Sequence, residues 1–167
     1  MKEKKRKTYK VSVTFTVTKP KRFSAVPNKK KRTHYTPCEV SLTPPNGRVT
    51  WDSAANAFSV HHCSNGPIEF SLSMGPKGDY FPAGIAFVPK RSPGSPRLLG
   101  LGPVRANFQS TPVVIDNGVL TFTDDCVSNT YGKWFEFYLY FQRNDGEQGI
   151  IDPGIQHING SGASIAH

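Results

Sequence analysis

The alternation of side chains between residues 132 and 155, GKWFEFYLYFQRNDGEQGIIDPGI, constrains the fold more than any other feature of the chain. From position 135 to 142 it has a period of two residues, which is the period of a β-strand and not of a helix. One face is wholly apolar and is expected to lie in a core: Phe135, Phe137, Leu139 and Phe141. The other face is amphipathic and is expected to be half covered: Trp134, Glu136, Tyr138, Tyr140 and Gln142. Aromatic side chains on both faces predict a central strand, because an edge strand of this kind adheres to other chains.

The residues after this strand predict how the chain returns. Asn144-Asp145-Gly146 supplies residues that tolerate a positive φ, so the chain is expected to reverse there. Gly149 to Ile151 then pairs back on the long strand. Asp152-Pro153-Gly154 is predicted to form a second turn, because proline has no N–H for a β-ladder.

Length and composition predict one all-β domain. The chain has 167 residues, is rich in valine, phenylalanine, threonine and tyrosine, and contains 15 glycines and 14 prolines. No window has helical periodicity; residues 90–103 read as a surface loop, and Val104, Ala106 and Phe108 mark a strand after it. Other short strands are predicted at 9–18, 39–43, 49–52, 57–61, 67–73, 85–88, 112–116 and 119–123. This spacing favours a single antiparallel β-sandwich of roughly 8–10 strands with an immunoglobulin-like architecture.

The chain divides into a basic N-terminal arm at 1–8, a β-sandwich domain at 9–159 and a flexible C-terminal tail at 160–167. No segment is apolar enough to span a membrane, and the alternating residues after the basic start are not a signal peptide. The three cysteines are unclustered and odd in number, which fits a reducing compartment. One disulfide bond between two of them is the alternative. These features predict a soluble cytoplasmic protein.

The positive charge is concentrated at the N-terminus. Residues 1–32 hold 13 lysines and arginines and one acid, a net charge of +12, whereas the remainder holds 8 basic and 11 acidic residues, a net charge of −3. A polyanion such as nucleic acid is the partner that this asymmetry favours, and solubility alone or a nuclear localisation signal are alternatives. The predicted polyanion-binding residues are Lys4, Lys5, Arg6, Lys7, Lys29, Lys30, Lys31 and Arg32.

His61-His62-Cys63 is the one local cluster of metal-ligand residue types. On a strand, His61 and Cys63 would share a face and His62 would not, and a metal site would need two further ligands. His34, His157, Cys38 and Cys126 are present, but none has a supporting spacing. We therefore predict surface histidines beside a buried thiol, no metal site and no cofactor. Asp124-Asp125 is interpreted as a loop cap, because no calcium-loop spacing surrounds it.

No catalytic signature is found. The chain has no G-x-S-x-G, no phosphate-binding glycine loop followed by a helix, and no cysteine–histidine pair in a recognisable local context. The sequence therefore predicts a non-enzymatic binding or assembly module whose partner is a protein, either a second copy or another chain. A nucleic-acid-associated protein that uses the basic segment at 1–32 is the alternative. A metalloprotein using His61 and Cys63 is the third.

Two segments carry a resemblance to a known family. Residues 131–140, YGKWFEFYLY, followed by 149–155, GIIDPGI, resemble the end of small bacterial β-sandwich proteins of unknown function, such as the DP-EP family. In these, a G-x-W/Y-x-Y-x strand precedes a final D-P-x-I strand. The architecture is also similar to cupredoxin-like domains, whose copper-binding members carry cysteine and histidine near the end of the penultimate strand. Gln142 to Asp145 stands there, which argues against a blue-copper role. The resemblance implies a fold and a bacterial setting and no activity.

Overall fold

The computed structural model describes residues 6–18, 38–89, 101–128 and 132–158. They form strands together with an α-helix and the 3-10 turn η1 at Cys63–Asn65. The strands are β1 (Tyr9–Val17), β2 (Cys38–Thr43), β3 (Val49–Asp52), β4 (Ala57–Val60), β5 (Ile68–Gly75), β6 (Tyr80–Pro89), β7 (Val114–Asp116), β8 (Val119–Asp124), β9 (Trp134–Arg143), β10 (Gln148–Ile151) and β11 (Gly154–His157). The predicted all-β fold is confirmed.

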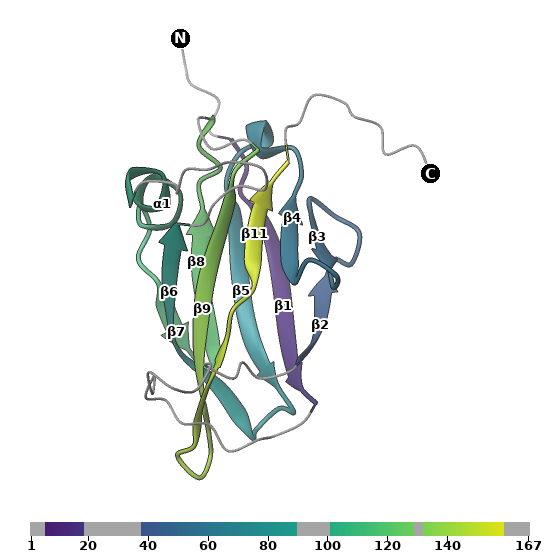
Figure 1. Ribbon diagram of the computed structural model, residues 1–167, viewed down its shortest axis with the longest axis vertical. Coiled ribbons are helices and arrows are strands. Elements are labelled where there is room, and N and C mark those ends of the chain that lie inside the picture. The colour runs from purple at the N-terminus through teal and green to yellow at the C-terminus, as the bar shows by residue number, and fades with distance from the viewer. Residues whose placement is uncertain (1–5, 19–37, 90–100, 129–131, 159–167) are drawn as a thin grey trace, which may run out of the picture.

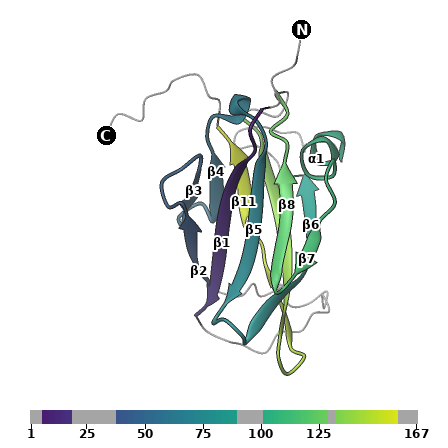
Figure 2. The same ribbon diagram turned by 180° about the vertical axis from the view of Figure 1, so that it is seen from behind.

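Two sheets pack face to face as a sandwich (Figures 1 and 2). The first, sheet A, has five strands in the order β2-β1-β5-β8-β7. The second, sheet B, has six strands. Its hydrogen-bonded path is β10-β9-β11-β4-β3, with β10 and β11 along one side of β9 and β6 along the opposite side. Most neighbouring strands are antiparallel, as predicted. Two pairs are parallel, β1 with β5 and β4 with β11, which the sequence analysis did not anticipate.

The long alternating strand is β9, and it is central, as predicted. Its odd-numbered side chains from Phe135 to Phe141 are at most 1% exposed, whereas the outward side chains are half-buried and Tyr140 is 42% exposed. β6 pairs along one side of β9, and β10 and β11 pair along the other. Inward alternation on β1, β5 and β8 supplies the opposing layer of the core.

The predicted turn at Asp152-Pro153-Gly154 is wrong. β10 and β11 follow one another along the same side of β9, so the chain continues in one direction through this segment. Pro153 cannot donate to the ladder, but its carbonyl oxygen accepts the N–H of Phe137 at 3.1 Å. Proline therefore interrupts the strand without reversing it.

The strand predicted at Val104, Ala106 and Phe108 is also wrong. Leu101–Phe108 forms a helix, α1, in place of a loop followed by a strand. Val104, Asn107 and Phe108 are buried at helical spacing, whereas Arg105 and Ala106 are exposed. Pro103 lies in the first turn, where a missing N–H removes no hydrogen bond within the helix.

The helix α1 closes one end of the sandwich, beside β6 (Figure 1). The Phe108 ring stacks on Phe87 of β6 at 4.5 Å and meets Phe122 of β8 edge to face at 6.2 Å, so it fills the space between the sheets at this end. Within the described part of the chain, no helix is both long and apolar enough to cross a membrane.

Candidate functional site

The predicted polyanion-binding residues are only partly described. Arg6 and Lys7 are exposed and lead into β1. Lys4, Lys5 and the run from Lys29 to Arg32 lie outside the described residues, as do the C-terminal tail and His34. In the sequence, β1 separates the basic residues at 2–7 from the basic run at 29–32.

The expectation that His61 and Cys63 share a strand face is wrong. β4 ends at Val60, and His62 adopts a left-handed conformation with φ 54° that starts the 3-10 turn. His61 is half-buried, and its Nε2 atom lies 3.0 Å from Thr50 Oγ1. Cys63 turns into the protein and is 1% exposed. The predicted buried thiol is confirmed and His62 is exposed as predicted, whereas His61 is not a fully exposed surface residue.

Arg48 holds the loop that carries Cys63. Its guanidinium Nη2 donates to the carbonyl oxygens of His62 at 2.9 Å and Gly66 at 2.8 Å. Since these two acceptors bracket the 3-10 turn, one arginine fixes both of its ends. The loop conformation that buries the thiol is therefore maintained by charge-assisted hydrogen bonds to the backbone.

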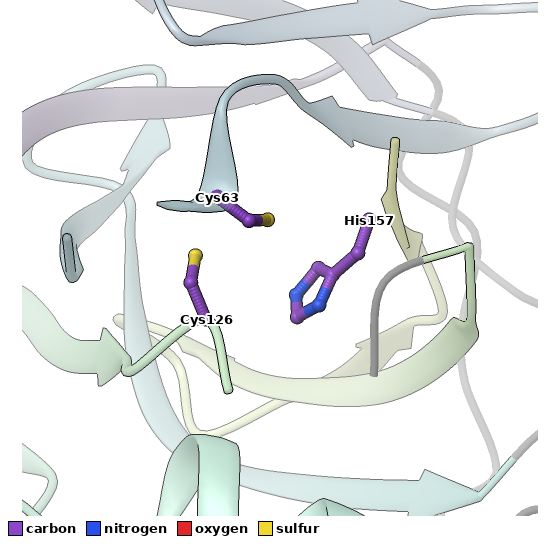
Figure 3. Close-up of side chains that lie close together, drawn as sticks. All are labelled: Cys63, Cys126 and His157. Carbon is purple, nitrogen blue, oxygen red and sulfur yellow. The ribbon is translucent and has the colours of Figure 1, made fainter. Parts of the chain in front are cut away.

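Cys63, Cys126 and His157 meet at one end of the sandwich, and sequence reasoning missed this cluster. Their sulfur atoms and a ring nitrogen all lie within 4.8 Å of one another, and each residue is at most 4% exposed. Figure 3 shows the three side chains converging on one space, with the sulfur atoms of Cys63 and Cys126 and the imidazole ring of His157 around it. Among the described residues, this is the group of histidine, cysteine and acidic side chains placed to hold a metal ion.

The strand register brings the cluster together. β4 and β11 are parallel, with His157 opposite Val60, and the N–H of Ile158 bonds to the carbonyl oxygen of Val60 at 2.9 Å. Cys63 comes directly after β4, at the start of η1, so it lies next to His157. Cys126 follows the carboxyl end of β8 in the facing sheet. The cluster could therefore have been found only from the pairing of β4 with β11, and residue spacing in the sequence does not reveal that pairing.

Asp124 is buried beneath the cluster and organises two of its members. Its Oδ2 atom lies 2.7 Å from Nε2 of His157, and its Oδ1 accepts the N–H of Cys126 at 3.0 Å. The carboxylate, the thiol and the imidazole are all inaccessible to solvent or nearly so. The interpretation of Asp124 as a cap is correct, because it caps the loop that carries Cys126, and it also orients the histidine.

The cluster shifts the protonation of its members. The hydrogen bond from the Cys126 thiol lowers the pKa of Cys63, and the same bond together with burial raises the pKa of Cys126. Burial alone would lower the pKa of His157, but the charge and hydrogen bond of Asp124 raise it above its ordinary value. Cys63 is therefore the thiol that loses its proton more readily.

A cysteine, a histidine and a carboxylate in contact also form nucleophilic catalytic sites. In this protein Cys63, His157 and Asp124 are at most 1% exposed. A substrate does not reach the sulfur atom without opening the end of the sandwich. The geometry therefore favours an internal role over action on an external molecule.

The exposed edge of sheet A is a second candidate site. Three of the four large hydrophobic side chains exposed on the described surface lie at β7 or just before it: Val113 at 41%, Val114 at 53% and Ile115 at 47%. Within the described residues β7 pairs with β8 alone, so its other side is the edge of the sheet (Figure 2). We call residues 113–115 the β7 edge.

The other sheet edges carry features that oppose strand addition. β2 presents Glu39, β3 ends in Asp52, and β6 contains Pro82 with an irregular register before Gly84. The β7 edge has neither charge nor proline between positions 113 and 115, although Pro112 precedes it and β7 itself ends in Asp116. The feature that distinguishes it is therefore its three exposed aliphatic side chains.

Comparisons with protein-family models, with curated proteins and with solved structures found no match for this chain. The fold and its sites thus define a class only, a β-sandwich protein with a buried thiol–imidazole cluster and an apolar edge strand.

Proposed function

We propose that this protein is a non-enzymatic binding and assembly module that pairs with a second copy of itself through the β7 edge. The observation that carries the proposal is the exposure of three adjacent aliphatic side chains on an edge strand. Contiguous apolar surface on a strand edge marks a site of strand addition.

A second copy is the favoured occupant because edge pairing is self-complementary. Two antiparallel β7 strands related by a twofold axis present the same residues to each other, which is the simplest closed symmetry. Such pairing joins two five-stranded sheets into one and covers the exposed valines and isoleucine of both copies. Since β7 has only three residues, the contact is small and the dimer is expected to be reversible.

Sedimentation velocity over a range of protein concentrations tests this proposal. The parent chain is expected to shift from monomer to dimer as its concentration rises. Val114→Lys places a charge on the edge strand, where repulsion between copies opposes pairing, and it is expected to stay monomeric. Because Val114 is 53% exposed, the substitution leaves the core intact.

Ser41→Lys is the matched control. It introduces the same charge on an exposed position of β2, at the opposite edge of the same sheet, and is expected to dimerise like the parent. A parent chain that stays monomeric at every concentration argues against self-assembly. A dimer that survives Val114→Lys places the contact elsewhere.

Association with nucleic acid through the basic segment at 1–32 is the second candidate function. The observation that favours it is the net charge of +12 on these residues, against −3 on the remainder. Each lysine or arginine that neutralises a phosphate releases a counterion, so this association is expected to weaken as the salt concentration rises.

A further inference from the structure

The buried cluster of Cys63, Cys126 and His157 has the composition of a metal centre. Thiolate and imidazole are the ligands that zinc and monovalent copper prefer in proteins. The three ligand atoms come from three separate parts of the chain: the turn after β4, the loop after β8, and the end of β11. Each side chain is at most 4% exposed, so the ligands face one another and not water.

The separations fit a shared ion. A metal bound at ordinary lengths, about 2.3 Å to sulfur and about 2.0 Å to nitrogen, holds its ligand atoms about 3.5–4 Å apart. In this protein all three atoms lie within 4.8 Å of one another. An inward movement of about 1 Å, which side-chain torsions supply, therefore brings them to bonding distance of a central ion.

The surroundings of the cluster are those of a supported ligand set. Metal-bound histidines usually bond through their second nitrogen to a carboxylate, which fixes the ring. Asp124 lies 2.7 Å from His157 Nε2, so the ion would be bound through the other ring nitrogen, Nδ1, and Asp124 also accepts the N–H of Cys126 at 3.0 Å. One buried carboxylate thus positions two of the three ligands before any ion arrives.

The backbone gives an independent indication. Four non-glycine residues of the described chain have a positive φ. Asn56, Asn117 and His62 belong to residue types that adopt this conformation more often than most, whereas Cys126 does not. Unfavourable backbone conformations persist at ligand-holding sites, where the surrounding structure imposes them. The loop that carries Cys126 is therefore held in a conformation that packing alone does not favour.

We propose that Cys63, Cys126 and His157 together bind one thiophilic d10 metal ion, Zn²⁺ or Cu⁺. Binding replaces the two thiol protons, which leave to solvent, and places two thiolates and a neutral imidazole around the ion. Three ligands are one fewer than a structural zinc site has, which favours Cu⁺ over Zn²⁺. Because the site is closed to solvent, the ion is structural. It connects the loop after β8 in sheet A to η1 and β11 on the side of sheet B, and so fastens the two sheets together at one end.

The first test is metal analysis of the full chain. The protein is purified without a metal-chelating column under reducing conditions, and its zinc and copper contents are measured by mass spectrometry. One ion per chain is expected, and X-ray absorption should show metal–sulfur distances of about 2.3 Å. Competition of the metal-free chain with a Zn²⁺-selective and a Cu⁺-selective chelator distinguishes the two ions.

Variants separate this site from other thiols. Cys63→Ser and Cys126→Ser are expected to lose stoichiometric metal and the stabilisation that it provides, whereas Cys38→Ser, at the half-buried third cysteine, is expected to keep both. Because the buried variants risk misfolding, Co²⁺ is also titrated into the reduced, metal-free parent chain. Thiolate-to-cobalt charge-transfer absorption, rising to one equivalent, is expected.

Two results overturn the proposal. The first is a folded, reduced parent chain that takes up neither Zn²⁺, Cu⁺ nor Co²⁺ and whose melting temperature does not change with metal or chelator. The second is uptake that Cys38→Ser abolishes and Cys63→Ser leaves intact. Neither result depends on the oligomeric state, so the assembly proposal and the metal site stand or fall separately.

Discussion

Phe137→Ala tests the packing between the two sheets. Phe137 is fully buried on β9, and its ring meets Phe58 of β4, Phe87 of β6 and Phe122 of β8 at centroid distances of 6.3, 6.0 and 5.9 Å. Since β8 belongs to the facing sheet, this side chain joins both layers of the core.

The expected magnitude follows from these contacts. Removal of a buried phenylalanine ring costs about 3–5 kcal/mol of unfolding free energy, and the loss of three aromatic contacts places Phe137→Ala near the upper end. With a urea dependence of about 2 kcal/mol per molar, the unfolding midpoint should fall by about 2 M. Urea titration followed by circular dichroism measures the change.

Tyr140→Ala is the control on the same strand. Its side chain points outward and is 42% exposed, so the expected change is within about 0.5 kcal/mol. If Phe137→Ala costs less than about 1 kcal/mol, the ring is not part of a packed core and the assignment of the β9 faces is incorrect.

Two further predictions concern the loop after β8, which carries Cys126, and the positive charge of the N-terminal segment. Asn107→Ala should destabilise the protein by about 1–3 kcal/mol in the same titration, because the buried Asn107 Oδ1 accepts the N–H of Val127 at 2.9 Å and the change leaves that donor unpaired. Asn107→Asp keeps the acceptor but places a carboxylate in a fully buried position, so it should cost at least as much. Deletion of residues 1–7 together with serines at 29–32 should leave the fold intact and abolish retention on a polyanion column at low salt, since each lost cation removes a phosphate contact. Elution at the position of the parent chain would remove support for a nucleic-acid partner.

The local parts of the fold were predictable from the sequence. The alternation at 135–142 defined the buried face of β9, and Asn117-Gly118 with the apolar runs around it indicated the β7–β8 hairpin. Both depend on period and on turn residues, which act over a few positions. Failures occurred where a distant partner decides the outcome. Pro153 was predicted to turn the chain, but the ladder with β9 keeps it extended.

The helix α1 illustrates the same limit. Val104 and Phe108 lie four residues apart, a spacing that a strand and a helix both place on one side. The choice is made by packing, because Phe108 stacks on Phe87 and meets Phe135, two residues on different strands. A helix brings Asn107 to the same side as Phe108, where its carbonyl and side-chain oxygens accept the N–H groups of Asp125 and Val127. A strand would separate the two side chains.

The cluster of Cys63, Cys126 and His157 could not be predicted from local sequence patterns, and the reason is physical. A zinc-finger spacing is visible in sequence because its ligands lie on one short unit that folds around the ion. In this protein the ligands stand at positions 63, 126 and 157, and they meet because β4 and β11 pair in parallel while β8 ends in the facing sheet. The sandwich therefore has to form before the site exists.

It follows that an ion bound at this site stabilises the completed fold and does not nucleate it, so metal should slow unfolding more than it speeds folding. Stopped-flow kinetics of the metal-loaded and metal-free chains measure the two rates. A metal effect confined to the folding rate would show that the ligands assemble early, contrary to this order of events.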